Sequence, residues 1–134
     1  MKAIDLQDAE FRYDGNDLQI CLRKDDLPEQ IPDSSVILEI DGIINLYTTQ
    51  SLSQIVDNLI KRDIKNLFFN LSKVKYIDSS GLGAIMGFHV RLNKLGGYLK
   101  IFSPSSTVDK VMKMIKLKSI LAVYETVEEA ILSI

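Results

Sequence analysis

The sequence has little of what identifies a disulfide-bonded, membrane-spanning or nucleic-acid-binding protein. It contains one cysteine, Cys21, which excludes an intramolecular disulfide, and it has no run approaching the roughly 20 apolar residues of a membrane span. The N-terminal stretch MKAIDLQDAEF lacks the apolar region of a signal peptide. With 16 basic and 18 acidic residues, the net charge of −2 gives no electrostatic argument for binding nucleic acid or an anionic membrane. We therefore expect a soluble, cytoplasmic protein that binds neither.

Two features that could be taken for reactive or binding sites have simpler interpretations. Cys21 alternates with Ile20 and Leu22 in a strand-like run, so a buried, inert thiol is expected rather than a nucleophile or a ligand. Four lysines near the C-terminal end stand at near-helical spacing with apolar residues between them, which is typical of a solvated helix face: Lys110, Lys113, Lys116 and Lys118.

The length and the first third of the chain fit a small globular domain. A chain of 134 residues, with 46% apolar and 25% charged residues, has the size and composition of one domain. Asp14 and Gly15 form a hairpin-type turn signal, and the alternating apolar residues of 18–22 predict the strand that follows. The polar stretch 24–35 contains two prolines and predicts a long surface connection. The apolar stretch 36–42 predicts a strand that ends at a glycine.

Beyond this strand the apolar pattern alternates between helical and extended spacing. Helices are expected at 48–63, 80–95, 103–117 and 125–134, and strands at 66–71, 98–102 and 120–124, with a charged connection at 72–75. The boundary signals are Thr48 or Thr49 as a helix cap, Gly96 and Gly97 as a helix end, Pro104 in a first helical turn, and Thr126 with Glu129 as a capping box. This alternation predicts an α/β fold with a largely parallel sheet, preceded by an antiparallel strand or two.

The segment YIDSSGLGAIMGFHV, residues 76–90, is unusual because it combines paired serines with glycines in a helical pattern. Gly81, Gly83 and Gly87 each lower helix stability by about 1 kcal/mol relative to alanine. A dinucleotide site is one interpretation of GLGAIMG, but the glycines do not follow the preceding strand directly and no acidic residue stands about 20 positions further on. The nucleotide-binding interpretation is therefore weak.

A serine nucleophile is a second interpretation of the same segment. The hydrolase elbow G-x-S-x-G would need a glycine where Ile77 and Asp78 stand. The sole histidine, His89, lies further along the same helix, about 14 Å from the serines by helical rise, which is beyond hydrogen-bond reach. We expect His89 to be a hydrogen-bonded residue of the core or its boundary, and we expect no hydrolase chemistry.

Two further interpretations remain open for the serines. Asp78, Ser79 and Ser80 can simply cap a helix, but a cap does not require glycines in the first turn. A hydroxyl at a helix N-terminus also tolerates an attached phosphate, and positions without side chains at Gly81 and Gly83 would let another protein approach closely. The pattern therefore also fits a phosphoacceptor and docking site.

Three stretches together resemble a known family, the STAS domain of bacterial anti-sigma factor antagonists: YIDSSGLGAIMG, LGGYLKIFSPSSTVDKVMKMIKL and ILAVYETVEEAI. The resemblance is good over residues 36–134 and loose over 1–35. It implies a single STAS domain over 1–134, with a mixed, mostly parallel sheet of roughly four to six strands flanked by about four helices. It also implies a protein without catalytic activity, cofactor or metal.

The resemblance further implies partners and a switch. Family members bind an anti-sigma factor that is also a GHKL-type serine kinase, and they release a sigma factor when unphosphorylated. Phosphorylation of the serine after the motif aspartate blocks binding, and a PPM-type phosphatase reverses it. By position this serine is Ser79, with Ser80 as the runner-up. The implied phosphorylation neighbourhood and partner-binding residues are Asp78, Ser80, Gly81, Leu82, Gly83, Gly42 and Asn45, and the implied state is a monomer or weak homodimer.

The sequence departs from the family pattern at one place near the expected site. The family usually has G-E-[LI]-D after its second strand, whereas here GIIN places Ile43 and Asn45 in the acidic positions. Two alternative functions are therefore kept besides the phosphorylation switch. The second candidate is a phosphorylation-independent STAS scaffold in a signalling complex, and the third is a nucleotide-binding protein.

Overall fold

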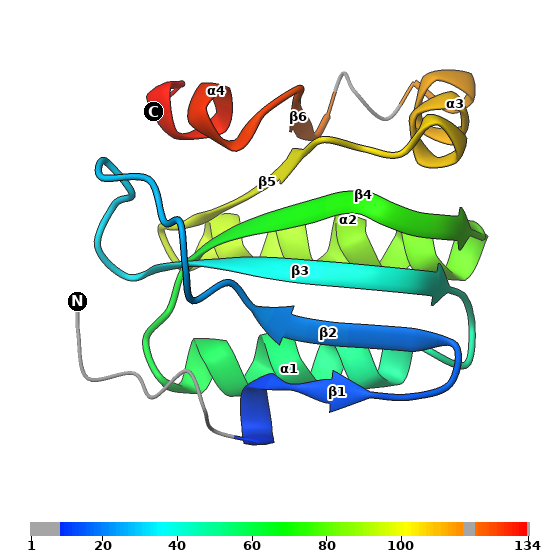
Figure 1. The fold of residues 1–134 in the computed structure, drawn as a ribbon, viewed down its shortest axis with the longest axis horizontal. Coiled ribbons are helices and arrows are strands. Elements are labelled where there is room, and N and C mark those ends of the chain that lie inside the picture. The colour runs from blue at the N-terminus through cyan, green and yellow to red at the C-terminus, as the bar shows by residue number, and fades with distance from the viewer. Residues whose placement is uncertain (1–8, 117–119, 134) are drawn as a thin grey trace.

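The computed structural model describes residues 9–116 and 120–133, which form one six-stranded sheet with helices on both faces (Figure 1). The elements in chain order are a 3₁₀ turn at Ala9–Phe11, β1 (Tyr13–Asp14), β2 (Leu18–Leu22), β3 (Ser35–Ile44), α1 (Thr49–Lys61), β4 (Asn66–Ile77), α2 (Ser79–Lys94), β5 (Tyr98–Phe102), α3 (Ser106–Met114), β6 (Ala122–Tyr124) and α4 (Val127–Leu132). The strand order is β1-β2-β3-β4-β5-β6, antiparallel from β1 to β3 and parallel from β3 to β6. The predicted α/β fold with a mixed, mostly parallel sheet is confirmed.

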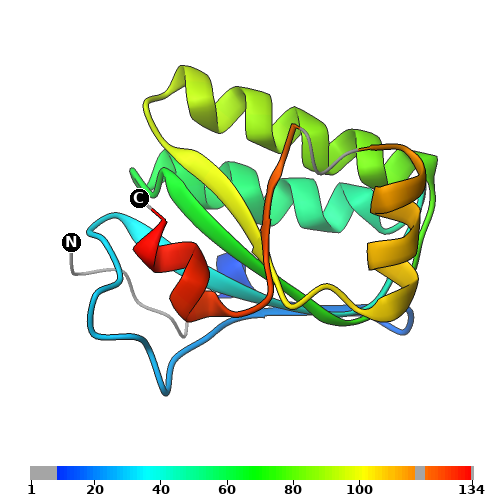
Figure 2. The ribbon, with the colours of Figure 1, turned by 90° about the horizontal axis from the view of Figure 1, so that it is seen from above.

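The helices divide between the two faces of the sheet, as Figure 2 shows. Helices α1, α2 and α3 contribute apolar side chains to the larger core, among them Leu52, Val56, Ile85, Leu92 and Met112. The short helix α4 packs on the opposite face, where Val127, Ala130 and Ile131 meet Ile37, Phe68 and Phe102. The central strand β4 is therefore covered on both faces over its first half, as its nearly continuous apolar sequence predicts.

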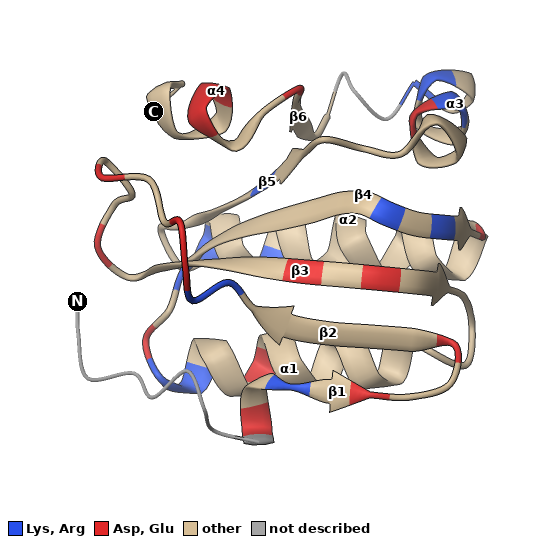
Figure 3. Cartoon of the chain, viewed as in Figure 1, with Lys and Arg blue, Asp and Glu red and all other residues tan. Residues whose placement is uncertain are grey.

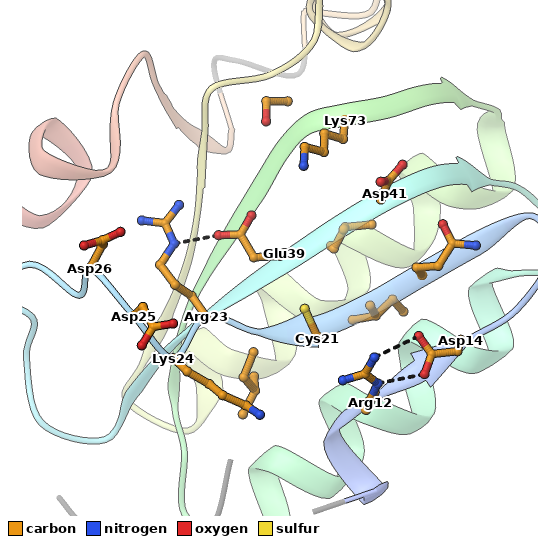
Figure 4. Close-up of a pocket in the computed structure, with 15 residues that line it drawn as sticks. Arg12, Asp14, Cys21, Arg23, Lys24, Asp25, Asp26, Glu39, Asp41 and Lys73 are labelled. Carbon is orange, nitrogen blue, oxygen red and sulfur yellow. Dashed lines mark hydrogen bonds and ion pairs between the residues drawn. The ribbon is translucent and has the colours of Figure 1, made fainter. Parts of the chain in front are cut away.

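The part of the second face that α4 leaves open is polar (Figure 4). There Glu39 accepts hydrogen bonds from Arg23 Nε at 2.6 Å and from Asn70 Nδ2 at 2.7 Å. Cys21 belongs to this face, because Ile20 and Leu22 point to the larger core. The expectation of a buried thiol is therefore wrong: Cys21 is half-buried on a sheet surface without a covering helix.

Strand β4 is longer than its sequence predicts. The expected charged connection 72–75 lies inside it, and the strand continues to Ile77. Its pairing with β3 has two register shifts, after the pair Glu39–Asn70 and after Gly42–Val74, so β4 gains an extra residue at each. These bulges let exposed lysines stand within a paired strand, which a strict two-residue alternation does not anticipate.

Of the other boundary predictions, the strand end at Gly42 was wrong, because β3 continues to Ile44, and most of the rest were correct. The Asp14–Gly15 hairpin is present, Gly96 ends α2 with a positive φ, and Thr126 Oγ1 accepts a hydrogen bond from Glu129 N at 3.2 Å. The first-turn position of Pro104 was wrong, because Ser105 is the cap of α3 and accepts from Val108 N.

Two sequence interpretations concern the molecular surface. Of the four clustered lysines, Lys110, Lys113 and Lys116 are exposed as expected, and Lys118 lies outside the described residues. Within the part of the chain that the structure describes, no helix is long and apolar enough to cross a membrane.

Candidate functional site

The candidate site lies where two strand-to-helix loops meet at the carboxyl ends of β3 and β4, at the right of Figure 1. Ile44 and Ile77 are the last paired residues of the two strands, and Asp78 N donates a hydrogen bond to Ile44 O at 3.2 Å. The loop from β3 to α1 is thereby held against the start of α2. Asn45 and Asp78, far apart in sequence, each follow directly on one of these paired residues.

Asp78 caps α2 and leaves the serines free. It has extended backbone angles, and its Oδ1 accepts a hydrogen bond from Gly81 N at 2.9 Å. Ser79 is the first helical residue and is exposed, and Ser80 is partly exposed. Neither hydroxyl makes a hydrogen bond within the described residues, so of the three possible caps, Asp78, Ser79 and Ser80, only Asp78 caps the helix with its side chain.

Gly81 and Gly83 of α2 have different surroundings. A Cβ on Gly81 would lie 2.8 Å from the Ile44 carbonyl oxygen and from side-chain carbons of Ile44 and Ile77. Gly81 is therefore needed for internal packing, and the space left by its missing side chain faces Ile44 and Ile77. Gly83 is exposed, and a Cβ on it would have no atom of another element within 4 Å, so it can lie at a protein contact. Leu82, only 8% exposed, belongs to the core.

Asn45 organises the loop before α1. Its Oδ1 accepts hydrogen bonds from Tyr47 N at 2.9 Å and Thr48 N at 3.0 Å. Thr48 Oγ1 accepts from Asn45 N and donates to Ile43 O, both at 2.8 Å. Neither Thr48 nor Thr49 caps the first turn of α1 with its side chain, so that prediction was wrong. The spacing Asn-x-x-Thr was the available signal for this arrangement.

Gly42 lies inside the sheet rather than at the partner-accessible surface. It is buried with φ +121°, and a Cβ there would overlap the carbonyl oxygen of Asp17. The next amide, Ile43 N, donates to the same oxygen at 2.8 Å. Gly42 thus joins β3 to the β1–β2 turn, and it affects the site only through the path of the backbone.

The sequence interpretation missed three exposed apolar side chains in the segments that lead into α1 and α2. Leu46 and Tyr47 lie in the loop before α1, and Tyr76 precedes Asp78 by two residues. The pair Leu46-Tyr47 directly after Asn45 was a visible signal, but its exposure depends on how the loop folds back on itself.

Helix α2 carries no catalytic arrangement with the serines. His89 lies ten positions from Ser79, about 15 Å by helical rise, and its Nε2 is 3.2 Å from Asn93 Nδ2. Its Nδ1 is buried and has no hydrogen-bond partner among the residues that the structure describes, so the expectation of a fully hydrogen-bonded histidine is wrong for that atom. Phe88 packs edge-on against Phe69, whereas Val90 is exposed. Among the described residues, no group of three or more His, Cys, Asp or Glu side chains could hold a metal ion.

Comparisons with known proteins agree on one family. The family model of the STAS domain matches residues 27–130. A Thermotoga maritima protein provisionally named an anti-sigma factor antagonist is 29% identical over 104 residues, covering 77% of this chain and 92% of that protein. The anti-sigma-B factor antagonist of Staphylococcus aureus strain NCTC 8325 is 26% identical over 91 residues, covering 68% and 84%.

Solved structures show the same fold. The crystal structure of the Thermotoga maritima protein has a TM-score of 0.70 at 28% identity, covering 79% of this chain and 92% of that one. The anti-sigma factor antagonist SpoIIAA in its unphosphorylated form has a TM-score of 0.66 at 22% identity, covering 84% and 92%. A structure of SpoIIAA from Bacillus is also known in the phosphorylated form.

Proposed function

Because the chain belongs to the STAS domain family, we propose that it is an anti-sigma factor antagonist controlled by phosphorylation of Ser79. In this proposal the unphosphorylated protein binds an anti-sigma factor that is also a GHKL-type serine kinase, and so releases a sigma factor. A PPM-type phosphatase restores the binding form. The observation that carries the proposal is the Ser79 hydroxyl, exposed and without a hydrogen-bond partner among the described residues, at the amino end of α2.

The surroundings of Ser79 suit a phosphate on the free protein. Helix α2 has 16 residues and no acidic residue in its first turn, and its capping carboxylate, Asp78, accepts from only one of the first-turn amides, Gly81 N. A phosphate adds about −1.5 to −2 charges at pH 7 and can lie near the free amides of this turn. Phosphorylation therefore requires no rearrangement of the fold.

The same charge can prevent docking. Like charges brought together across an interface cost several kcal/mol. Moving a two-state population from 1:99 to 99:1 takes about 5.5 kcal/mol. The repulsion from one phosphate at the contact surface is thus comparable to the free energy that a switch requires.

Several observations support Ser79 over Ser80 and binding over catalysis. Ser79 is the more exposed of the two serines, whereas Ser80 is partly covered. His89 is too far along α2 to act as a base for either hydroxyl. The relatives are named for antagonising anti-sigma factors, which is a binding role.

Phosphorylation by purified GHKL-type kinases of the source organism, with ATP, tests the proposal. Intact mass should show a gain of about 80 Da, one phosphoryl group, on the wild type and on Ser80→Ala, but not on Ser79→Ala. Treatment with a PPM-type phosphatase should remove it. Phosphorylation of Ser79→Ala to the wild-type extent would assign the acceptor elsewhere and contradict the proposal.

One observation favours a second candidate, a phosphorylation-independent STAS scaffold. Ile43 and Asn45 stand where the family has acidic residues, and the Asn45 carboxamide is occupied by backbone amides of its own loop. Partner binding by a protein that no kinase phosphorylates would favour the scaffold. The nucleotide-binding alternative loses support, because Gly81 faces Ile44 and Ile77 rather than open space.

A further inference from the structure

The C-terminal end of α3 and the start of the segment before β6 expose three large apolar side chains, which we call the apolar tip. Met114 is 80% exposed, Ile115 49% and Ile120 55%. The chain on either side of them is fixed, because Met112 and Leu121 are both buried in the larger core. The apolar tip therefore lies at the surface although both flanks of its segment are anchored in the same core.

Lysines stand among these apolar side chains. Lys110, Lys113 and Lys116 are all exposed, and Lys110 and Lys113 lie about one turn apart on α3. Figure 3 shows basic residues on α3 and on the end of β4. A solvated lysine face, which the sequence predicts here, does not account for the exposure of Met114 and Ile115 between the lysines.

The segment has an excess of positive charge after its own carboxylates are counted. Residues 110–124 contain four lysines and no acidic residue. At the flanks, Asp109 Oδ2 lies 2.9 Å from Lys113 Nζ, and Asp109 and, more weakly, Glu125 raise the pKa of Lys113. With both carboxylates included, residues 109–125 keep a net charge of +2 in a chain whose net charge is −2.

The elements beside α3 do not compensate this charge. Helix α3 packs on β4, which carries Lys73 and Lys75 toward its end. Residues 64–108, which include β4, α2 and β5, contain a single acidic residue, Asp78. The acidic residues of the chain are thus concentrated elsewhere, and the whole-chain net charge conceals a local basic surface around the apolar tip.

We propose that this surface docks reversibly on an anionic lipid bilayer. Apolar side chains enter the boundary between headgroups and acyl chains, while lysine ammonium groups remain at the anionic headgroups, so a mixture of the two suits this interface. An acidic protein would instead need apolar and acidic groups interleaved at the same spacing. The contact is with the bilayer surface only, and it does not depend on phosphorylation of Ser79.

Co-sedimentation of the purified protein with vesicles tests the inference. The wild type should bind vesicles of equal parts phosphatidylcholine and phosphatidylglycerol at low salt, and should bind phosphatidylcholine vesicles at least about fivefold more weakly. Lys110→Glu should lower the partition coefficient about fivefold or more, and Met114→Ser about threefold or more. The matched controls are Lys24→Glu, exposed beyond β2, and Leu132→Ser, 70% exposed on α4, and both should bind like the wild type.

The possible outcomes separate the parts of the inference. No binding of the wild type to the mixed vesicles, or equal binding to both kinds of vesicle, would overturn it. Unchanged binding of Met114→Ser would overturn insertion of the apolar tip, and unchanged binding of Lys110→Glu would overturn the electrostatic contact. Soluble glycerol phosphate, which has the headgroup chemistry without a bilayer, should not release the protein from vesicles. Release at equal phosphate concentration would indicate a small-anion site and contradict bilayer docking.

Discussion

At Gly81 the first turn of α2 lies against Ile44 and Ile77 with no room for a side chain, whereas Gly83 on the same helix faces open space. We expect Gly81→Ala to destabilise the fold by about 1–3 kcal/mol, because the added methyl group must displace neighbouring atoms. Gly83→Ala should instead stabilise it by up to about 1 kcal/mol through helix propensity. Urea denaturation of both variants measures the difference, and equal effects of the two substitutions would contradict the assigned packing.

Lys100 is a buried cation whose acceptors are both at the end of α4. Its Nζ donates to Ala130 O at 2.9 Å and Ser133 Oγ at 2.7 Å, and burial lowers the pKa of this ammonium group. The unfolded chain then binds more protons than the folded one between the lowered pKa and the usual value near 10.5. The stability of the wild type relative to Lys100→Met should therefore rise with pH in that window. Denaturation series of the wild type and Lys100→Met at increasing pH measure this difference, and a difference that stays flat or falls in that window would contradict it.

The loop between β3 and α1 is held in its conformation by the side chains of Asn45 and Thr48. Asn45→Ala should lower the free energy of unfolding by about 1 kcal/mol, because two backbone amides lose their acceptor. Asn45→Asp keeps a side-chain oxygen at the same place and should retain most of this stability. Hydrogen exchange of residues 47–52 should be faster in Asn45→Ala only. Equal exchange in both variants would show that Asn45 does not hold the loop.

The elements also show where sequence reasoning succeeded. The helix and strand periods were sufficient for every major element, because each helix buries one apolar face and the central strands are covered on both sides. The end of β4 and the cap of α1 were missed for one physical reason. Both depend on contacts with a distant or folded-back segment: the bulged pairing of β4 with β3, and the Asn45 side chain turning onto its own loop.

The candidate site could be predicted only in part. Ser79 was predicted because both the DSSGLG pattern and the start of a helix at that pattern can be recognised from the sequence. The packing requirement at Gly81 could not be found in this way, since it follows from contact with Ile44, which is far away along the chain. The exposure of Tyr47 could not be found either, since it depends on how its loop folds back on the Asn45 side chain.

For the whole molecule, phosphorylation should be a change of surface charge rather than of fold. The α2 amino end can accommodate a phosphate, and the core below it is formed by apolar side chains that the modification would not disturb. Amide chemical shifts should therefore change mainly in residues 40–50 and 75–90 on phosphorylation. Large changes throughout β5, α3 or α4 would indicate a rearrangement that is not expected here.

The most direct test of the central claim is the affinity of the cognate anti-sigma factor kinase for the two forms of this protein. Calorimetric titration should compare the unphosphorylated chain with the chain phosphorylated at Ser79, at the same salt concentration. We predict at least about a hundredfold weaker binding of the phosphorylated form, as expected for several kcal/mol of repulsion. Equal affinities of the two forms would contradict the switch.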